Sequence, residues 1–418
     1  MTPVSRPARS GIALVLSGGG ARGAYEAGVL AGLRDVLGSR ADKPPVFDVL
    51  SGASVGAINA AHLAAHADRC DLGIPELLEL WTALRTDTHV RPRLTTFIDW
   101  PKRSLAPRRS GSPYASRWGH ALLDPEPFER LVGAAIPWKR LHDNVRTGIV
   151  HALIVSAFNI VKERTNTFVE LAPETSFVPL PPRDPRRASM IELVTADHIL
   201  ASAALPFLFP ARRVGGSYYC DGGLRFNTPI APAIRSGARR LVVVSLRPVR
   251  SPRDEKAVEP YPNRMFLLGR ILDALLQDPI DYDLQVLERF NRVLAVMTKT
   301  VPPSALDRIA RVLEAERGLP YRRLRSLVFR PSVNIGVLAL EHLRRHGTGR
   351  ASFGTRLFLE KAASLGEHVE ADLLSFVLFD GSFARTLIEL GRRDVEKRAD
   401  EVQSFFLAED GPDTASTT

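Results

Sequence analysis

The stretches IALVLSGGGARG at residues 12–23 and VFDVLSGASVG at residues 46–56 decide the fold of this chain. Each is a short apolar run that ends in a glycine-framed turn, and small residues follow the second turn. Apolar runs bounded by glycine predict buried strands, and the segments after them predict helices. The sequence thus predicts a strand–turn–helix–strand unit with parallel strands and a right-handed crossover.

The second turn carries a serine at the apex of a GxSxG motif, from Gly52 to Gly56. A serine on such an elbow is exposed to substrate, and small neighbours are needed because the turn is strained. A tight turn whose serine caps the next helix would show the same letters. The position after an apolar strand and before a small-residue helix favours Ser54 as a nucleophile.

The first turn allows two interpretations. Gly18, Gly20 and Gly23 match the GxGxxG fingerprint of dinucleotide-binding folds, which also requires an acidic residue at the end of the second strand. Here Asp48 lies near the start of that strand, which argues against NAD. The alternative is an oxyanion hole at a helix N-terminus. Arg22 would then neutralise a developing anion or a lipid phosphate, or only pack its stem along the turn.

An elbow serine needs a base, and the usual base is a histidine. None of the ten histidines lies in a glycine-framed loop between apolar runs. Three of them, in amphipathic segments, are predicted to be surface residues: His342, His346 and His368. The segment 217–225 instead delivers Asp221 onto a turn formed by Gly222 and Gly223. An Asx turn at a strand end is the simpler explanation of that pattern.

The motifs GGGARG, GASVG and DGG, in this order and at this spacing, resemble the patatin-like phospholipase family. Residues 201–210 and the sequence NTP at residues 227–229 are similar to the segments around the catalytic aspartate in bacterial members. The resemblance covers residues 11–245 and shows no departure at a motif position. It implies a three-layer α/β sandwich with a central, mostly parallel sheet.

The resemblance also implies a Ser–Asp dyad without histidine, in which Ser54 is the nucleophile and Asp221 is its base. The family's oxyanion hole corresponds here to Gly18, Gly19, Gly20 and Arg22. The family hydrolyses acyl esters of phospholipids and related lipids without a metal, so we expect no metal and no cofactor. Burial makes a carboxylate a better base, because desolvation raises its pKa above the reference value of about 3.9.

The composition is that of a globular protein that interacts with anionic surfaces. The chain has 418 residues, 45% of them hydrophobic, and a net charge of +10. No nucleic-acid motif accompanies the charge, which favours a membrane surface as partner over nucleic acid. The stretch from Arg91 to Trp118 mixes basic and aromatic residues, as an anionic lipid interface requires. A solvated lid or linker is the plainer interpretation of this stretch.

The two cysteines, Cys70 and Cys220, cannot form a disulfide framework and indicate a reducing compartment. Cys220 is predicted to pack inward on a strand rather than to act as a thiol nucleophile. No apolar run approaches the length of a transmembrane helix, and the run after Arg6 and Arg9 is too short for a secretory signal. We therefore expect a cytoplasmic protein with peripheral contact to the membrane.

The organisation along the chain follows from shifts in composition. We expect a flexible leader at 1–10, a catalytic domain at 11–246, a charged proline-rich linker at 247–263, a mostly helical extension packed on the core at 264–409, and a disordered tail at 410–418. Within it, a helix is predicted over 75–85 with Pro75 in its first turn, and a late strand over 327–329. The oligomeric state is left open.

Three functions remain to be compared. The leading hypothesis is a serine hydrolase of lipid acyl esters. A catalytically silent protein that binds lipid or acts as a scaffold could use the same fold, but retention of Ser54, Asp221 and the glycine turn argues against it. A histidine-dependent esterase is the third and would lose its activity when its histidine is replaced.

Overall fold

A computed structural model describes most of the chain. It covers residues 11–40, 46–89, 121, 123–173, 175, 177, 185–206, 208–226, 228–248, 279–319, 322–347, 355–356, 359–360 and 372–407. The predictions for the leader at 1–10, for the basic aromatic stretch from Arg91 to Trp118 and for the tail at 410–418 lie outside these residues, as does most of the predicted linker.

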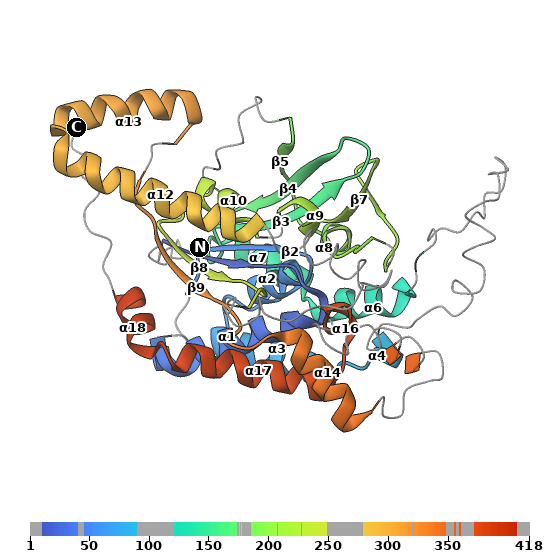
Figure 1. Ribbon diagram of the computed structural model, residues 1–418. Coiled ribbons are helices and arrows are strands. Elements are labelled where there is room, and N and C mark those ends of the chain that lie inside the picture. Colours follow the sequence, from blue (N-terminus) through green and yellow to red (C-terminus); the bar gives the residue numbers. More distant parts are fainter. Residues whose placement is uncertain are drawn as a thin grey trace, which may run out of the picture.

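The described strands form one sheet of nine strands, most of them parallel (Figure 1). The strands are β1 Ile12–Leu16, β2 Val49–Ala53, β3 Ala152–Asn159, β4 Arg164–Leu171, β5 Arg187–Ile191, β6 Arg212–Val214, β7 Ser217–Asp221, β8 Arg240–Val244 and β9 Arg325–Phe329. The order is β5-β4-β3-β2-β1-β8-β9, with β7 paired to β3 and to β6. The strands β3, β2, β1, β8 and β9 are mutually parallel, whereas β4 and β7 run antiparallel to β3. The predicted α/β class with a mostly parallel sheet is confirmed.

Helices cover both faces of the sheet (Figure 1). They are α1 Ala24–Leu37, α2 Val55–Ala65, α3 Cys70–Ala83, α4 Thr86–His89, α6 Pro125–Ala135, α7 Trp138–Arg146, α8 Ala196–Ser202, α9 Gly223–Phe226, α10 Ile230–Arg235, α12 Pro279–Thr300, α13 Pro303–Arg317, α14 Ile335–His346, α16 Asp372–Val377, α17 Gly381–Glu396 and α18 Ala399–Leu407, with short 3₁₀ turns η1 Gly20–Gly23 and η2 Gly38–Arg40. Successive side chains of a strand point to opposite faces. In β1, Leu14 and Leu16 therefore pack with α1 and α2, whereas Ala13 and Val15 pack on the face covered by α10 and α12.

The C-terminal region completes both the sheet and one helical layer. Strand β9 pairs in parallel with β8 and is the last strand at that edge. Helix α17 packs along α1, and a Cβ added at Gly391 would lie 2.6 Å from the carbonyl oxygen of Tyr25. A helix pair this close needs glycine at the contact, because any side chain would push the backbones apart.

Two local predictions are wrong. Helix α3 begins at Cys70 rather than Pro75, because the Arg69 carbonyl accepts hydrogen bonds from the N–H groups of Leu72 and Gly73 and so builds a first turn ahead of the proline. His342 is buried rather than on the surface, because α17 packs against α14 and brings the Ser382 hydroxyl within 3.1 Å of the ring. His346 is exposed as predicted, and His368 lies outside the described residues.

Among the helices that the structure describes, none is both long enough and apolar enough to cross a bilayer.

Candidate active site

The register of the sheet brings Ser54 and Asp221 together. Strand β4 occupies one edge of β3 along its full length, so β2 and β7 must share the other edge. They approach along it from opposite ends: Ala53, the last residue of β2, lies opposite Ser156, and Asp221, the last residue of β7, lies opposite Ala157. The elbow serine and the aspartate of the DGG turn, 167 positions apart in sequence, therefore meet where the two strands end.

Ser54 sits on a strained turn between β2 and α2. Its φ of 53° is positive, which is rare for a residue other than glycine. The elbow closes on its own backbone, since a Cβ at Gly52 would overlap the carbonyl of Gly56, and one at Gly56 would lie 2.5 Å from the carbonyl oxygen of Leu16. Strain at a single position held by its surroundings is typical of functional sites. The two elbow glycines are thus required for close approach, as the motif predicts.

Asp221 is a fully buried carboxyl group that is only partly satisfied. Its Oδ1 accepts a hydrogen bond of 2.7 Å from the N–H of Gly223. No group in the described part of the chain forms a hydrogen bond to its Oδ2. Desolvation by burial raises the pKa of Asp221 from 3.8 to about 7, and the nearby Ser54 side chain and the Gly223 N–H oppose part of that rise. A carboxyl group with this pKa can exchange a proton near neutral pH.

Ser202, which the sequence analysis did not single out, ties the elbow to the central strand. Its hydroxyl accepts a hydrogen bond of 2.8 Å from the N–H of Ser54 and donates one of 2.7 Å to the carbonyl of Ser156. The backbone carbonyl of Ser202 accepts from the N–H of Gly222, at 3.3 Å. One residue of α8 thus contacts the elbow, the central strand and the DGG turn. A serine at the C-terminal end of a predicted helix carries no motif, so only its place within the similar segment 201–210 pointed to it.

The glycine-rich turn lies against the elbow. A Cβ at Gly23 would lie 2.5 Å from Cγ2 of Val55, the residue after Ser54. Within the turn, the N–H of Arg22 donates to the carbonyl of Gly19 at 3.2 Å. The N–H groups of Gly19 and Gly20 make no hydrogen bond to any residue that the structure describes. Two adjacent amides without an internal partner are what an oxyanion hole offers.

The side chain of Arg22 is directed toward the C-terminal helices. It is buried, its Nε donates to the Ser375 hydroxyl at 2.7 Å, and its guanidinium lies 4.0 Å from the centre of the Phe376 ring. Both contacts belong to α16. Arg22 therefore anchors the glycine turn to α16 through its side chain, which favours the packing interpretation over contact with a lipid phosphate.

A buried polar network lies behind the turn and joins three helices. Glu26 accepts a hydrogen bond of 2.8 Å from the amide of Asn59, and the Asn59 oxygen accepts one of 3.1 Å from the indole N–H of Trp81. Desolvation by complete burial raises the pKa of Glu26 well above its ordinary value. The network holds α1, α2 and α3 in a fixed arrangement directly after the glycine turn.

An apolar cavity begins at the residue that follows the elbow serine. It lies between α2, α3 and α6, and it is lined by Val55, Ile58, Asn59, His62, Leu77, Leu80, Trp81, Leu84, Phe128, Leu131, Val132, Ala135, Ile136 and Phe379. Only Asn59 and His62 in this lining are polar. Such a cavity suits a hydrocarbon chain, because burying it there removes apolar surface from water.

The competing chemistries find no support in the geometry. None of the histidines that the structure describes forms a hydrogen bond with Ser54. Burial raises the pKa of the Cys220 thiol to about 12, which keeps it protonated and unreactive. Asp48 lies before β2 and accepts a hydrogen bond from the N–H of Gly11, away from the turn where a ribose would bind.

Comparison with known proteins identifies relatives of this chain. The family model described as patatin-like phospholipase matches residues 14–234, which include both glycine-framed turns and Asp221. The chain is 31% identical over 219 residues to a cGAMP-activated phospholipase of Pseudomonas aeruginosa (strain BWHPSA011 / Pa011), an overlap of 52% of this chain and 53% of that protein. The chain thus spans about half the length of this curated relative. Among solved structures, VipD from Legionella pneumophila matches with a TM-score of 0.30 and 12% identity, over 90% of this chain and 92% of VipD.

Proposed function

Because the chain belongs to the patatin-like phospholipase family, a family of lipid acyl hydrolases, we propose that it cleaves acyl esters of phospholipids or related lipids through Ser54 and Asp221. The observation that carries the proposal is the meeting of a strained elbow serine with a buried carboxyl group whose pKa is raised to about 7. A base with a pKa near the working pH combines a useful deprotonated fraction with enough basicity to accept a proton.

The proposed reaction has two steps. The Ser54 hydroxyl oxygen attacks the ester carbonyl carbon while its proton passes to the Asp221 carboxylate, and the alcohol leaves with that proton when the tetrahedral intermediate collapses. Water then attacks the acyl-enzyme, Asp221 accepts a proton from that water, and the fatty acid leaves as Ser54 regains its proton. The N–H groups of Gly19 and Gly20, which donate to no residue that the structure describes, stabilise the oxyanion in both steps.

The apolar cavity supports a lipid acyl chain as the group transferred. Its wall starts at Val55, next to the nucleophile, and extends between α2 and α6 to Phe128. An acyl chain in this cavity would lie beside the elbow, because Val55 follows Ser54 directly. Asp221 is desolvated by the protein itself, which buries it completely.

The test is release of free fatty acid from mixed phospholipid vesicles by the wild type, Ser54→Ala and Asp221→Asn. Asp197→Asn, an exposed residue of α8, is the matched control. We expect release by the wild type and the control, and a loss of about 10³-fold or more in both dyad variants. A soluble p-nitrophenyl acyl ester serves in parallel, because Ser54-dependent cleavage of that ester alone would support the chemistry and reject the vesicle lipids as substrates. No activity on either substrate, with or without cGAMP, would favour a silent lipid-binding protein.

Contact with an anionic membrane is a separate proposal that rests on composition alone. The stretch from Arg91 to Trp118 carries the basic and aromatic residues that bind headgroups and the interface. Sedimentation with vesicles should then increase with anionic lipid content and fall with salt. Binding that depends on neither would contradict this proposal and leave the hydrolase proposal intact.

A further inference from the structure

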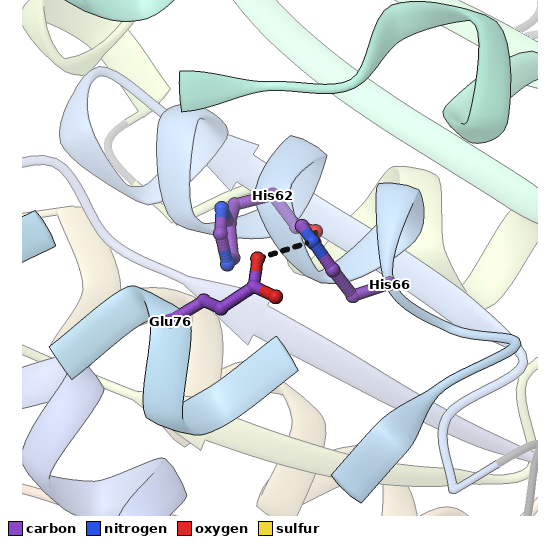
Figure 2. A group of neighbouring side chains, drawn as sticks. All are labelled: His62, His66 and Glu76. Carbon is purple, nitrogen blue, oxygen red and sulfur yellow. Dashed lines mark hydrogen bonds and ion pairs between the residues drawn. The ribbon is translucent and has the colours of Figure 1, made fainter. Parts of the chain in front are cut away.

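A second cluster of polar side chains lies two turns along α2 from the elbow. His62 lies near the end of this helix and His66, four positions on, is its C-cap residue, and Glu76 faces them from α3 (Figure 2). One nitrogen or oxygen atom from each of the three residues lies within 4.8 Å of the other two. Both histidines are buried, and their rings stack 4.3 Å apart. Glu76 is half exposed, so the cluster has a route to solvent.

The tautomer of His66 follows from its contacts. Its Nδ1 lies 2.8 Å from the carbonyl oxygen of His62, a group that can only accept, so Nδ1 carries the proton. In the neutral ring, Nε2 then has a lone pair, and this lone pair faces the Glu76 Oε2 at 2.8 Å. Two lone pairs at this distance repel unless a proton or a metal ion lies between them.

His62 has a similar conflict, because both of its ring nitrogens face backbone carbonyl oxygens. Its Nδ1 lies 3.2 Å from the carbonyl oxygen of Ala135, and its Nε2 lies 3.0 Å from that of Gly73. A neutral imidazole has one N–H, so it can donate to only one of these two acceptors. One lone pair of the ring therefore faces an oxygen lone pair.

We propose that His62, His66 and Glu76 bind a Zn²⁺ ion, with the Gly73 carbonyl oxygen beside them as the fourth ligand. The ion would accept the lone pairs of both Nε2 atoms, while each Nδ1–H stays donated to a backbone carbonyl, as metal-ligating histidines usually require. Nitrogen and carboxylate ligands on a short helical spacing suit zinc.

Two of the distances between the proposed ligand atoms can be compared with those of tetrahedral coordination. Ligand atoms of a zinc ion bound at about 2.0–2.1 Å lie roughly 3.3 Å apart. The 3.0 Å between His62 Nε2 and the Gly73 oxygen is close to that value. The 2.8 Å between His66 and Glu76 is shorter, and the half-exposed Glu76 side chain is free to withdraw by that difference.

The site would connect two walls of the apolar cavity. His62 lines the cavity from α2, and Leu77, which follows Glu76 directly, lines it from α3. A metal ion there fixes the separation of the two helices at the end of the cavity remote from the elbow. Its role is structural, and the hydrolytic step proposed for Ser54 and Asp221 does not use it. The prediction of no metal followed from the family resemblance, which concerns the hydrolytic site, whereas His62 and His66 lie apart from that site.

The test is calorimetric titration of Zn²⁺ into the chelator-treated full-length chain. Glu76→Gln keeps the size of the side chain but removes its charge, and Glu79→Gln on the exposed face of α3 is the matched control. We expect one ion per chain, affinity at least about tenfold weaker in Glu76→Gln, and wild-type affinity in Glu79→Gln. Co²⁺ at the same site should show the visible absorption of a tetrahedral ion, and Glu76→Gln should lose it.

Two results would overturn the proposal. One is no binding of Zn²⁺ by the wild type. The other is equal affinity in Glu76→Gln and Glu79→Gln, which would mean that the ion binds elsewhere. If His66 is protonated and forms a simple ion pair with Glu76, then Glu76→Gln lowers the melting temperature but no zinc binds, and that result also rejects the metal site.

Discussion

The region of residues 14–234 and the region from β9 to α18 differ in whether their sequences contain motifs that indicate a function. The first contains the glycine turn, the elbow and the DGG turn, and it alone matches the family. The second has no recognisable motif. Yet the backbone of α16 touches the glycine turn so closely that a Cβ at Gly20 would overlap the Phe376 carbonyl. A motif can therefore specify chemistry while residues without a motif hold its backbone in place.

The second region contributes to the site at two further points. Phe379 lines the apolar cavity together with residues of α2, α3 and α6. The Ser375 hydroxyl accepts from Arg22, the one charged residue of the glycine turn. If these contacts support the site, a substitution where the second region touches the glycine turn should reduce hydrolysis as strongly as one inside the first region.

Gly20→Ala tests this dependence and should have the largest effect. Gly20 has a φ of 57°, and its Cβ would meet the Phe376 carbonyl. Strain of about 1–2 kcal/mol and overpacking of about 1–3 kcal/mol should lower the free energy of unfolding by about 2–5 kcal/mol. Because α16 or the turn must move, hydrolysis should fall as well. Urea unfolding and fatty acid release would measure the two effects.

Gly38→Ala is the control for Gly20→Ala. Gly38 has the same φ of 57°, but nothing lies within 4 Å of its Cβ position. The Gly38→Ala variant should therefore lose only about 1–2 kcal/mol of the free energy of unfolding, from backbone strain, and keep its activity. Equal effects at both positions would show that φ, not the contact with α16, makes Gly20 necessary.

Asp221→Asn tests a loss of stability that arises within residues 14–234, from ionisation of the buried Asp221. Burial raises the pKa of Asp221 from 3.8 to about 7, so the folded state binds a proton more tightly than the unfolded state. Below pH 4 Asp221 is protonated in both the folded and the unfolded state, so it does not lower the free energy of unfolding. As the pH rises toward 7, only the unfolded state ionises, and the free energy of unfolding falls. At about 1.4 kcal/mol per pKa unit, the loss reaches at most about 4 kcal/mol.

The asparagine variant does not ionise and should escape this loss. Its stability relative to the wild type should increase between pH 4 and pH 7 and level off above pH 7. Wild-type hydrolysis should follow the opposite trend and rise through pH 7, because it requires the carboxylate. A variant that is no more stable than the wild type at pH 8 would show that Asp221 is not desolvated as the structure indicates.

The sequence was sufficient for the parts of the fold that depend on local chemistry. Apolar runs and glycine turns predicted β1, β2 and β7, and the resemblance joined Ser54 to Asp221. It was insufficient where long-range packing decides, since the burial of His342 depends on α17. Ser202 was missed for the same reason, because its three contacts come from distant segments.

Ser202→Ala should have an intermediate effect that falls mainly on activity. The change removes the acceptor for the Ser54 N–H and the donor to the Ser156 carbonyl, all within the buried core. Each buried group left unsatisfied should cost about 1–3 kcal/mol of stability. Hydrolysis should fall further than this stability loss explains, because the elbow loses its support. The measurement is kcat with the soluble ester at a temperature where the variant is fully folded.

Ser236→Ala is the control for Ser202→Ala. The Ser236 hydroxyl bonds only to carbonyls of its own helical turn, those of Pro232 and Ala233. It should change stability slightly and leave kcat unchanged. A kcat in Ser202→Ala equal to that of Ser236→Ala would remove Ser202 from the residues that position the elbow.

Tyr25→Phe tests the boundary between the two regions away from the turn and should have the smallest effect. The buried Tyr25 hydroxyl donates to Oδ2 of Asp394 on α17 at 3.1 Å. Asp394 keeps the N–H of Ser332, so the loss should be about 1 kcal/mol in urea unfolding, with hydrolysis retained. Tyr282→Phe, on an exposed tyrosine, should change nothing. If Tyr25→Phe abolished hydrolysis instead, α17 would support the elbow through α1, and the dependence of the motif on the second region would extend well beyond α16.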